Sequence, residues 1–144
     1  MDLKNGLAGF TESVETEYVA LGVGLLAVLL LAMQLQPSVK GGEQISISLK
    51  VDFGERVETR SLTLSNNTTA FEAVNGSFDV EYREYDMGYF ITSIGNVSMD
   101  SNHSWLYFVN SEPAKRAVNR YLLEDNDNLT FRYLENSKAS KYFD

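Results

Sequence analysis

The fold is first indicated by residues 44–53, QISISLKVDF. Apolar side chains occupy every second position, and polar or charged ones lie between them. The apolar set is Ile45, Ile47, Leu49, Val51 and Phe53. Because successive side chains of a β-strand point to opposite faces, this alternation predicts a strand buried on one side. Residues 52–55, DFGE, form the expected turn, and residues 57–64 return as the second strand of a hairpin.

A short helix is predicted after the hairpin. Residues 69–72, TAFE, have the capping-box pattern, in which the Thr69 hydroxyl and the Glu72 carboxylate accept hydrogen bonds from free N–H groups of the first turn. Asn75 and Gly76 then end the helix. About two turns of helix are stable only when they pack on a sheet.

Several later apolar runs are separated by Gly, Asn, Asp and Ser, which favour turns. The runs that we expect to be strands are residues 78–82, 89–94, 105–109 and 129–133. A hairpin, one short helix and then short strands indicate an α+β fold, with the helix on one face of a sheet.

Residues 18–35, YVALGVGLLAVLLLAMQL, contain no charged side chain. A helix of this length spans about 27 Å, close to the hydrocarbon thickness of a membrane. A cleaved signal peptide would have a basic start and a buried core helix would have a polar stripe, and neither is present. We therefore interpret residues 18–36 as an uncleaved transmembrane helix. The alternative is a pilin-like leader around residues 4–12, KNGLAGFTE, although polar residues follow it before the apolar run.

The N-glycosylation pattern Asn-x-Ser/Thr occurs six times, always after the apolar segment. The six positions are Asn66, Asn67, Asn75, Asn96, Asn102 and Asn128. A single pattern arises by chance in an Asn-rich chain, but this density near predicted turns fits glycosylated loops outside the cell. Lysines occur on both sides of the apolar segment, so the positive-inside rule does not determine its orientation in the membrane. Together with the lack of cysteine, the sequons favour an archaeal cell-surface protein, single-pass, with a cytoplasmic N-terminus and an extracellular C-terminal domain.

The composition restricts the function further. The net charge is −8, from 12 basic and 20 acidic side chains, and no basic cluster points to a nucleic-acid partner. There are no cysteines, so disulfides and thiolate sites are excluded. The expected organisation is an N-terminal tail (residues 1–17), the transmembrane helix (18–36), a linker (37–43), one extracytoplasmic domain (44–134) and a C-terminal tail (135–144).

Few residues have the patterns that catalysis or metal binding requires. His103 is the only histidine, and there is no Gly-x-Ser-x-Gly nucleophile elbow. Residues 124–128, EDNDN, place oxygen ligands at alternate positions but lack the glycine and glutamate of a calcium loop, so we interpret them as a solvated turn. We expect no enzyme activity, no metal site and no cofactor.

Four motifs in order carry a family resemblance. They are residues 69–73 (TAFEA), 88–94 (GYFITSI), 105–110 (WLYFVN) and 122–133, which run from Leu122 through Asp127 to Phe131-Arg132-Tyr133. They resemble the transcobalamin-like C-terminal domain family, which is largely of unknown function, over residues 44–133. The resemblance implies a β-grasp fold in which residues 105–110 are a strand entering a tight turn. Ser111 and Asn126 stand where the family usually or often has glycine, and both tolerate turns.

The strand at residues 105–109 has apolar side chains on both faces, with Trp105, Tyr107 and Val109 alternating on one of them. This pattern favours Trp105 as a core residue of a central strand. A binding role for the exposed edge of Trp105 is the alternative. The candidate ligand-binding residues are Tyr89, Trp105, Tyr107 and Asn110.

We therefore predict a membrane-anchored, cell-surface binding or interaction module without catalysis. In transcobalamin-like proteins the similar domain closes over a corrinoid together with a large helical domain. These 144 residues hold no such helical domain, so half of the corrinoid cleft would be missing. Another surface or membrane protein, meeting a sheet edge or residues 96–104, is the other partner considered. The alternative function is a structural subunit of a pilin-like filament or of a membrane complex.

Overall fold

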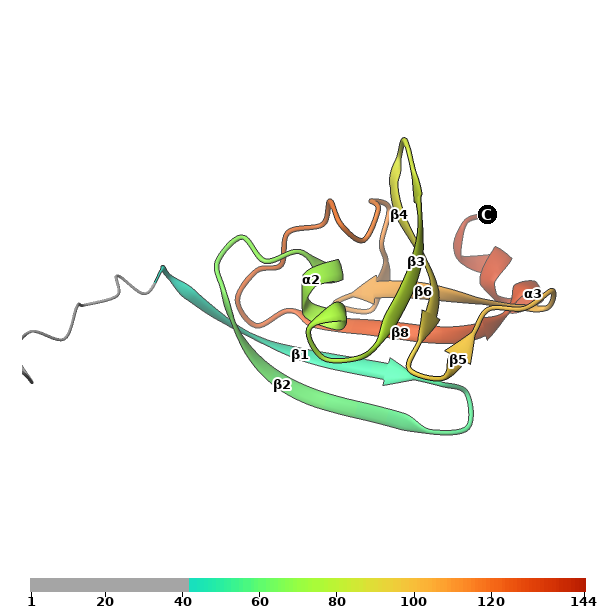
Figure 1. Cartoon of the computed structure of the whole chain (residues 1–144), viewed down its shortest axis with the longest axis horizontal. Coiled ribbons are helices and arrows are strands. Elements are labelled where there is room, and N and C mark those ends of the chain that lie inside the picture. The colour runs from blue at the N-terminus through green and yellow to red at the C-terminus, as the bar shows by residue number, and fades with distance from the viewer. Residues whose placement is uncertain (1–41) are drawn as a thin grey trace, which may run out of the picture. The chain divides into compact units, whose positions relative to one another are not determined.

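The main sheet joins two antiparallel strand pairs through one parallel pair (Figure 1). The computed structural model describes residues 42–144. The antiparallel pairs are β1 (Gln44–Asp52) with β2 (Val57–Ser65), and β6 (His103–Val109) with β8 (Asn128–Glu135). β1 runs parallel to β8, and β7 (Glu112–Pro113) closes the far edge, giving the order β2-β1-β8-β6-β7.

A second, smaller sheet and the short helices complete the described part. The sheet has the order β3-β4-β5, from β3 (Val80–Tyr85), β4 (Gly88–Ile94) and β5 (Val97–Ser98). The helices are α2 (Ala70–Asn75), α3 (Asn136–Ala139) and the 3-10 turn η1 (Ser140–Tyr142). Figure 1 shows α2 and the β3–β4 hairpin on the same side of the main sheet.

The core lies between α2 and the inner face of β1 and β8. All five alternating apolar residues of 44–53 are buried, as predicted: Ile45, Ile47, Leu49, Val51 and Phe53. Leu129 and Phe131 of β8 and Ala73 and Val74 of α2 belong to the same cluster. Since full burial of one such large apolar side chain stabilises a fold by roughly 1.5–3 kcal/mol, this face is the main source of stability.

The predicted capping box is present at α2. The Glu72 N–H donates to Thr69 Oγ1 over 3.2 Å, and the Thr69 N–H donates to Glu72 Oε2 over 2.7 Å. The N–H groups of Ala70 and Phe71 donate to backbone carbonyls of residues 121 and 118, each over 2.9 Å. The first turn of α2 is thereby tied to residues 118–121, which fixes the segment that borders the candidate site described below.

Some elements differ from the sequence-based expectation. The strand expected at residues 78–82 is β3 (Val80–Tyr85), because the Phe78 N–H still donates to the Val74 carbonyl over 2.9 Å at the end of α2. β5, β7 and the helices of the last ten residues were not predicted, since two-residue strands and single helical turns have no detectable period. The expected α+β class, mostly strands with short helices, is confirmed.

The N-terminal tail, the transmembrane helix and most of the linker predicted for residues 1–41 lie outside the described residues. Within residues 42–144, no helix combines the length and the apolar character that a membrane crossing requires.

Candidate functional site

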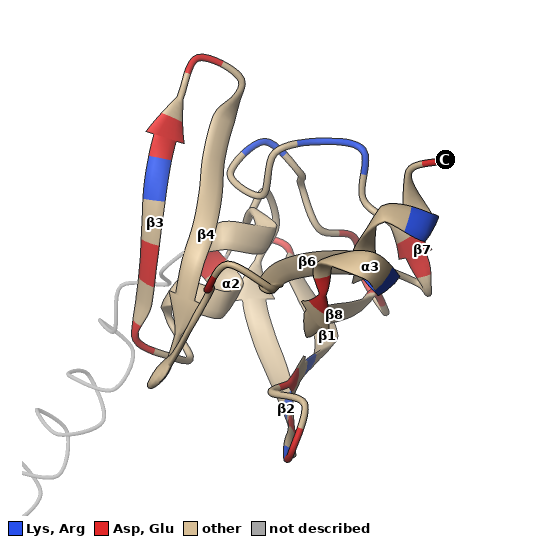
Figure 2. Ribbon diagram, turned by 90° about the vertical axis from the view of Figure 1, so that its right-hand side faces the viewer, with Lys and Arg blue, Asp and Glu red and all other residues tan. Residues whose placement is uncertain are grey.

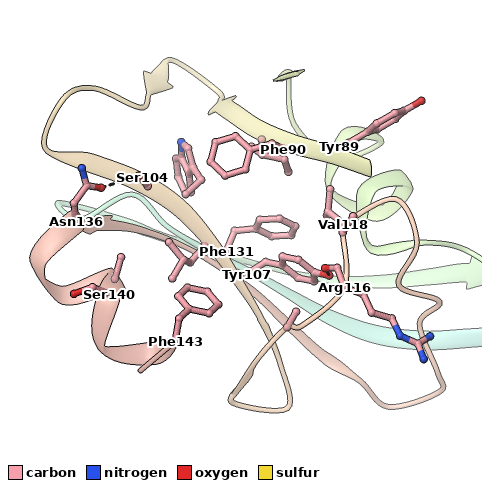
Figure 3. A pocket seen from close by; sticks show the side chains of 16 residues that line it. Tyr89, Phe90, Ser104, Tyr107, Arg116, Val118, Phe131, Asn136, Ser140 and Phe143 are labelled. Atoms are coloured by element: carbon pink, nitrogen blue, oxygen red, sulfur yellow. Dashed lines mark hydrogen bonds between the residues drawn. The ribbon is translucent and has the colours of Figure 1, made fainter. Parts of the chain in front are cut away.

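A cavity of about 400 Å³ opens beside the outer part of the main sheet (Figure 3). β4 contributes residues 89–91 to its lining and β6 contributes residues 104–107. Residues 114 and 116–118 form another part of its wall, and Phe131, α3, Ser140 and Phe143 form the rest. Most of the lining side chains are aromatic or aliphatic, so the cavity suits an apolar group.

Trp105 is a core residue whose side chain also reaches the cavity wall. It is only 5% exposed, and its ring meets Phe53 edge to face at a centroid distance of 5.7 Å. The indole N–H donates to the Val97 carbonyl over 3.0 Å. The expectation that Trp105 packs in the core is therefore confirmed.

Tyr107 is held rigidly at the same cavity. Its ring stacks on Phe131 at 5.7 Å, and its hydroxyl donates to the backbone carbonyl of Arg116. Burial raises the pKa of the Tyr107 hydroxyl strongly above its usual value of 10.0. The hydroxyl is thus a neutral, already engaged donor, and the ring is the part that a ligand can contact.

Tyr89 lies on β4, next to residues 117–119. Its N–H donates to Asn119 Oδ1 over 2.9 Å, and its ring stacks on Tyr82 at 4.4 Å. The neighbouring Gly88 has φ +129°, and a Cβ there would clash with Ala117 and lie 2.6 Å from Asn119 Oδ1, so only glycine permits this approach.

The side chain of Tyr89 is directed outward. Figure 3 shows its hydroxyl pointing away from the cavity. The negative charge of Glu84, followed by the influence of Tyr82, raises the Tyr89 pKa. Tyr89 therefore borders the cavity while its hydroxyl remains outside it.

Asn110 lies apart from the cavity, in the turn between β6 and β7. Its φ is 52° and that of Ser111 is 71°, as expected of residues that replace a turn glycine. Its Nδ2 donates to Asp127 Oδ1 over 2.8 Å, and its Oδ1 accepts from the Asn128 N–H over 2.9 Å. The structure thus brings together Tyr89, Trp105 and Tyr107, while the Asn110 side chain braces two turns.

The turn at residues 124–128 is less solvated than expected. Asp127 is buried, and its Oδ2 accepts the Glu124 N–H over 2.8 Å. Asn126 has φ 67°, which agrees with a position where glycine is common. Among the residues that the structure describes, no three His, Asp or Glu side chains gather in a way that could hold a metal ion.

Residues 96–104, considered from the sequence as a partner-binding segment, contain β5 and a tight turn. Asp100 Oδ1 accepts from the N–H groups of Asn102 and His103, over 2.7 and 2.8 Å. These bonds, first the one from Asn102, lower the pKa of Asp100 below 3.8. The His103 ring lies 3.1 Å from the same carboxylate and stacks on Tyr133 at 5.0 Å, so the turn is well ordered. All six sequon asparagines are exposed.

A second cavity, of about 810 Å³, adjoins the first. Tyr85, Asp86 and Met87 at the tip of the β3–β4 hairpin line it on one side. The basic segment, residues 115–120 (KRAVNR), lines it on the other with all three of its cationic side chains. Sequence reasoning missed these cations, although three basic residues within six positions and no acid were a visible signal.

Comparison with known proteins places this geometry in a structural class. Residues 67–135 match the family model described as "Domain of unknown function (DUF4430)". None of the curated proteins matches the sequence. In its strands and short helices, the described part of the chain has a fold similar to that of the two solved structures described next.

The first is haptocorrin in complex with Cbi, with a TM-score of 0.61 and 18% identity. The similarity covers 65% of this chain but only 25% of the haptocorrin chain. The second is a Ruminococcus gnavus protein described as a candidate metal-binding protein, with a TM-score of 0.55 and 16% identity, covering 64% of this chain and 98% of that one. At this identity the likeness concerns the fold, and it confirms the resemblance seen in the motifs at that level.

Proposed function

We propose that the chain is a non-catalytic binding module that receives a small molecule in the cavity beside Trp105 and Tyr107. The observation that carries this proposal is the cavity itself: its volume of about 400 Å³ and its aromatic walls are typical of small-molecule sites. The parallel β1–β8 pair between two antiparallel pairs, with α2 packed against it, supports the β-grasp assignment.

The two serine hydroxyls that line the cavity support binding over catalysis, because neither donates to a base. The Ser140 hydroxyl donates to the backbone carbonyl of Ser137 over 3.3 Å. The Ser104 hydroxyl donates to Asn136 Oδ1 over 2.7 Å, rather than to a histidine or carboxylate that could serve as its base (Figure 3). Nucleophilic catalysis by serine requires such a base in contact with the hydroxyl.

The ligands of the similar proteins provide the first compounds to test. Haptocorrin was solved with Cbi (cobinamide), but the similarity covers one quarter of that chain, so the corrinoid is a candidate rather than an assignment. A metal ion, as suggested for the Ruminococcus gnavus protein, is less favoured because no triad of ligating side chains gathers within residues 42–144.

The proposal is tested with a thermal-shift screen of the purified full chain against a small-molecule library that includes cobinamide. Ala114→Phe should fill the cavity, because Ala114 lines it. Thr59→Phe, on the exposed side of β2, is the matched control. A compound that raises the Tm of the wild type and of the control, but not of Ala114→Phe, supports the cavity as the site. The proposal fails if no compound raises the Tm, or if Ala114→Phe responds like the wild type.

We also propose that residues 18–36 anchor the domain at the outer face of a cell membrane. The uncharged apolar run and the exposure of all six sequon asparagines support this location. Protease applied to intact cells should remove the domain, and carbonate washing should leave the protein in the membrane pellet. A protease-protected protein that the wash releases would overturn this topology.

A filament or complex subunit remains the second candidate function. β2 has a neighbour on one side only and could accept a strand from a partner protein. Mass spectrometry of the mature N-terminus separates the two functions. A start at Met1 or Asp2 supports the anchor, whereas a start near Leu7 or Phe10 supports a processed, pilin-like subunit.

A further inference from the structure

The two cavities described above adjoin and differ in character. They share the lining residues Tyr89, Phe90, Arg116 and Ala117. The first is closed mainly by aromatic and aliphatic side chains, whereas the second is bordered by the basic segment. A single molecule that occupies both would meet an apolar environment at one end and a cationic one at the other.

None of the three cations of the basic segment forms an ion pair with an acidic side chain of the described residues, and Lys115 lines a further cavity together with Asp144. Within the part of the chain that the structure describes, the lysine and arginine ion pairs involve Arg56, Arg60 and Lys138, and none involves the basic segment. Arg120 Nη2 donates to the backbone carbonyl of Asp86 over 2.9 Å, which leaves its charge uncompensated. Asp86 is the one acid at the second cavity, against three cations.

This local excess of positive charge contrasts with the chain as a whole, whose net charge is −8. Figure 2 shows the blue positions of the basic segment beside β4, while acidic residues are spread over the other elements. Arginine and lysine side chains bind carboxylates through charge-assisted hydrogen bonds, which are stronger than neutral ones. The positive charge therefore selects for an anionic group at this end.

Exposed apolar side chains accompany the cations. Met87 is 81% exposed at the second cavity, and Phe143 is 65% exposed at the first. Each of these side chains is available for contact with a molecule in the cavity that it borders. Figure 3 shows the Arg116 guanidinium directed away from the aromatic rings, toward the outer side of the first cavity.

We propose that the ligand is a soluble amphipathic acid, whose apolar body enters the first cavity and whose carboxylate binds the cations of the basic segment at the second. This inference rests on the proposed small-molecule function and adds the chemical class of the ligand. The aromatic walls hold the apolar body without selecting its detailed shape. The basic segment separates acids from neutral molecules of the same size.

The test uses the full chain in nanodiscs of zwitterionic lipid, titrated with octanoate and with its uncharged analogue octanamide. Trp105 is the only tryptophan of the chain and lies in the cavity wall, so its emission reports binding directly. Empty nanodiscs provide the blank. Octanoate should bind at least tenfold more tightly than octanamide, because its carboxylate accepts charge-assisted hydrogen bonds that the neutral amide cannot match.

Two double variants assign the preference to the basic segment. Arg116→Gln with Arg120→Gln should reduce octanoate affinity at least tenfold, toward that of octanamide, and leave octanamide binding unchanged. Lys50→Gln with Arg83→Gln removes two exposed cations that line neither cavity and should change nothing. Far-ultraviolet circular dichroism establishes that all variants are folded.

Two results would overturn the proposal. Equal binding of octanoate and octanamide, both lost in Ala114→Phe, would remove the acid specificity and leave the small-molecule function standing. Failure to bind octanoate, with the basic segment required instead for attachment to nanodiscs that contain anionic lipid, would assign these cations to a lipid surface. The proposed small-molecule function fails separately, and only if no compound in the thermal-shift screen stabilises the protein through the cavity.

Discussion

Replacing Trp105 tests how the site is supported by the core. The indole is 95% buried, since 5% remains exposed, and an aromatic side chain buries about 150–250 Å². At about 25 cal/mol per Å², this burial corresponds to roughly 4–6 kcal/mol, of which a remaining alanine methyl keeps a part. We therefore expect Trp105→Ala to lower the free energy of unfolding by about 3–5 kcal/mol.

Trp105→Phe serves as the matched variant. It keeps most of the apolar volume and loses the N–H that donates to the Val97 carbonyl. That carbonyl also accepts from the Ser93 hydroxyl over 3.3 Å, so it is not left without a donor. We expect a loss of about 1–2 kcal/mol, from one hydrogen bond and imperfect packing.

The assay is urea unfolding of the full chain. Because both variants lack the only tryptophan, the transition is followed by near-ultraviolet circular dichroism of the tyrosines. The urea concentration at the midpoint should decrease from the wild type to Trp105→Phe and further to Trp105→Ala, while the m-value stays unchanged. A loss below about 1 kcal/mol for Trp105→Ala would show that the indole does not support the fold, and would refute this reasoning.

Three further predictions concern the rest of the domain. Thr69→Ala removes one half of the capping box and should cost about 0.5–2 kcal/mol in the same urea assay. Asp100→Asn should destabilise the domain at neutral pH, because the folded state lowers the pKa of the Asp100 carboxyl. The stability that this carboxylate contributes is present above pH 3.8, its ordinary pKa, and is lost as the pH falls through its folded pKa. Thermal scans of the variant and the wild type should therefore converge in acid. The raised pKa of Tyr107 predicts a stability loss above pH 10, and Tyr107→Phe should reduce that loss in alkaline unfolding curves.

Local patterns predicted the central elements because their signals lie within a few residues. The alternation of residues 44–53 depends on one face being buried, and the structure buries all five of its apolar positions. The capping box at Thr69 and Glu72 is a contact between residues three apart, so it can be read from the chain directly. The turns at Ser111 and Asn126 were likewise indicated by residue types that accept positive φ.

The candidate site was predicted only in part because a cavity depends on segments that are distant in the chain. Alternation identified Trp105 and Tyr107 as neighbours on one strand, but nothing local shows that Phe143 approaches them. Asn110 was predicted to bind the ligand because it follows the strand of Trp105 and Tyr107. Its side-chain amide instead forms hydrogen bonds with Asp127 and Asn128. Which partner a polar side chain at the end of a strand binds depends on tertiary contacts.

The basic segment illustrates the same limit. Its three cations are visible in the sequence, but neither their spacing nor the overall charge of −8 indicates a binding role. Their importance arises because Gly88 lets β4 approach residues 117–119 closely and so brings the segment to the cavity.

An isotope-filtered nuclear Overhauser experiment on the full chain with labelled octanoate would locate the ligand in the molecule. We expect contacts from the alkyl chain to the rings of Trp105 and Tyr107, together with carboxylate-induced shifts at Arg116. Contacts confined to residues outside both cavities, such as those of β2, would contradict this expectation.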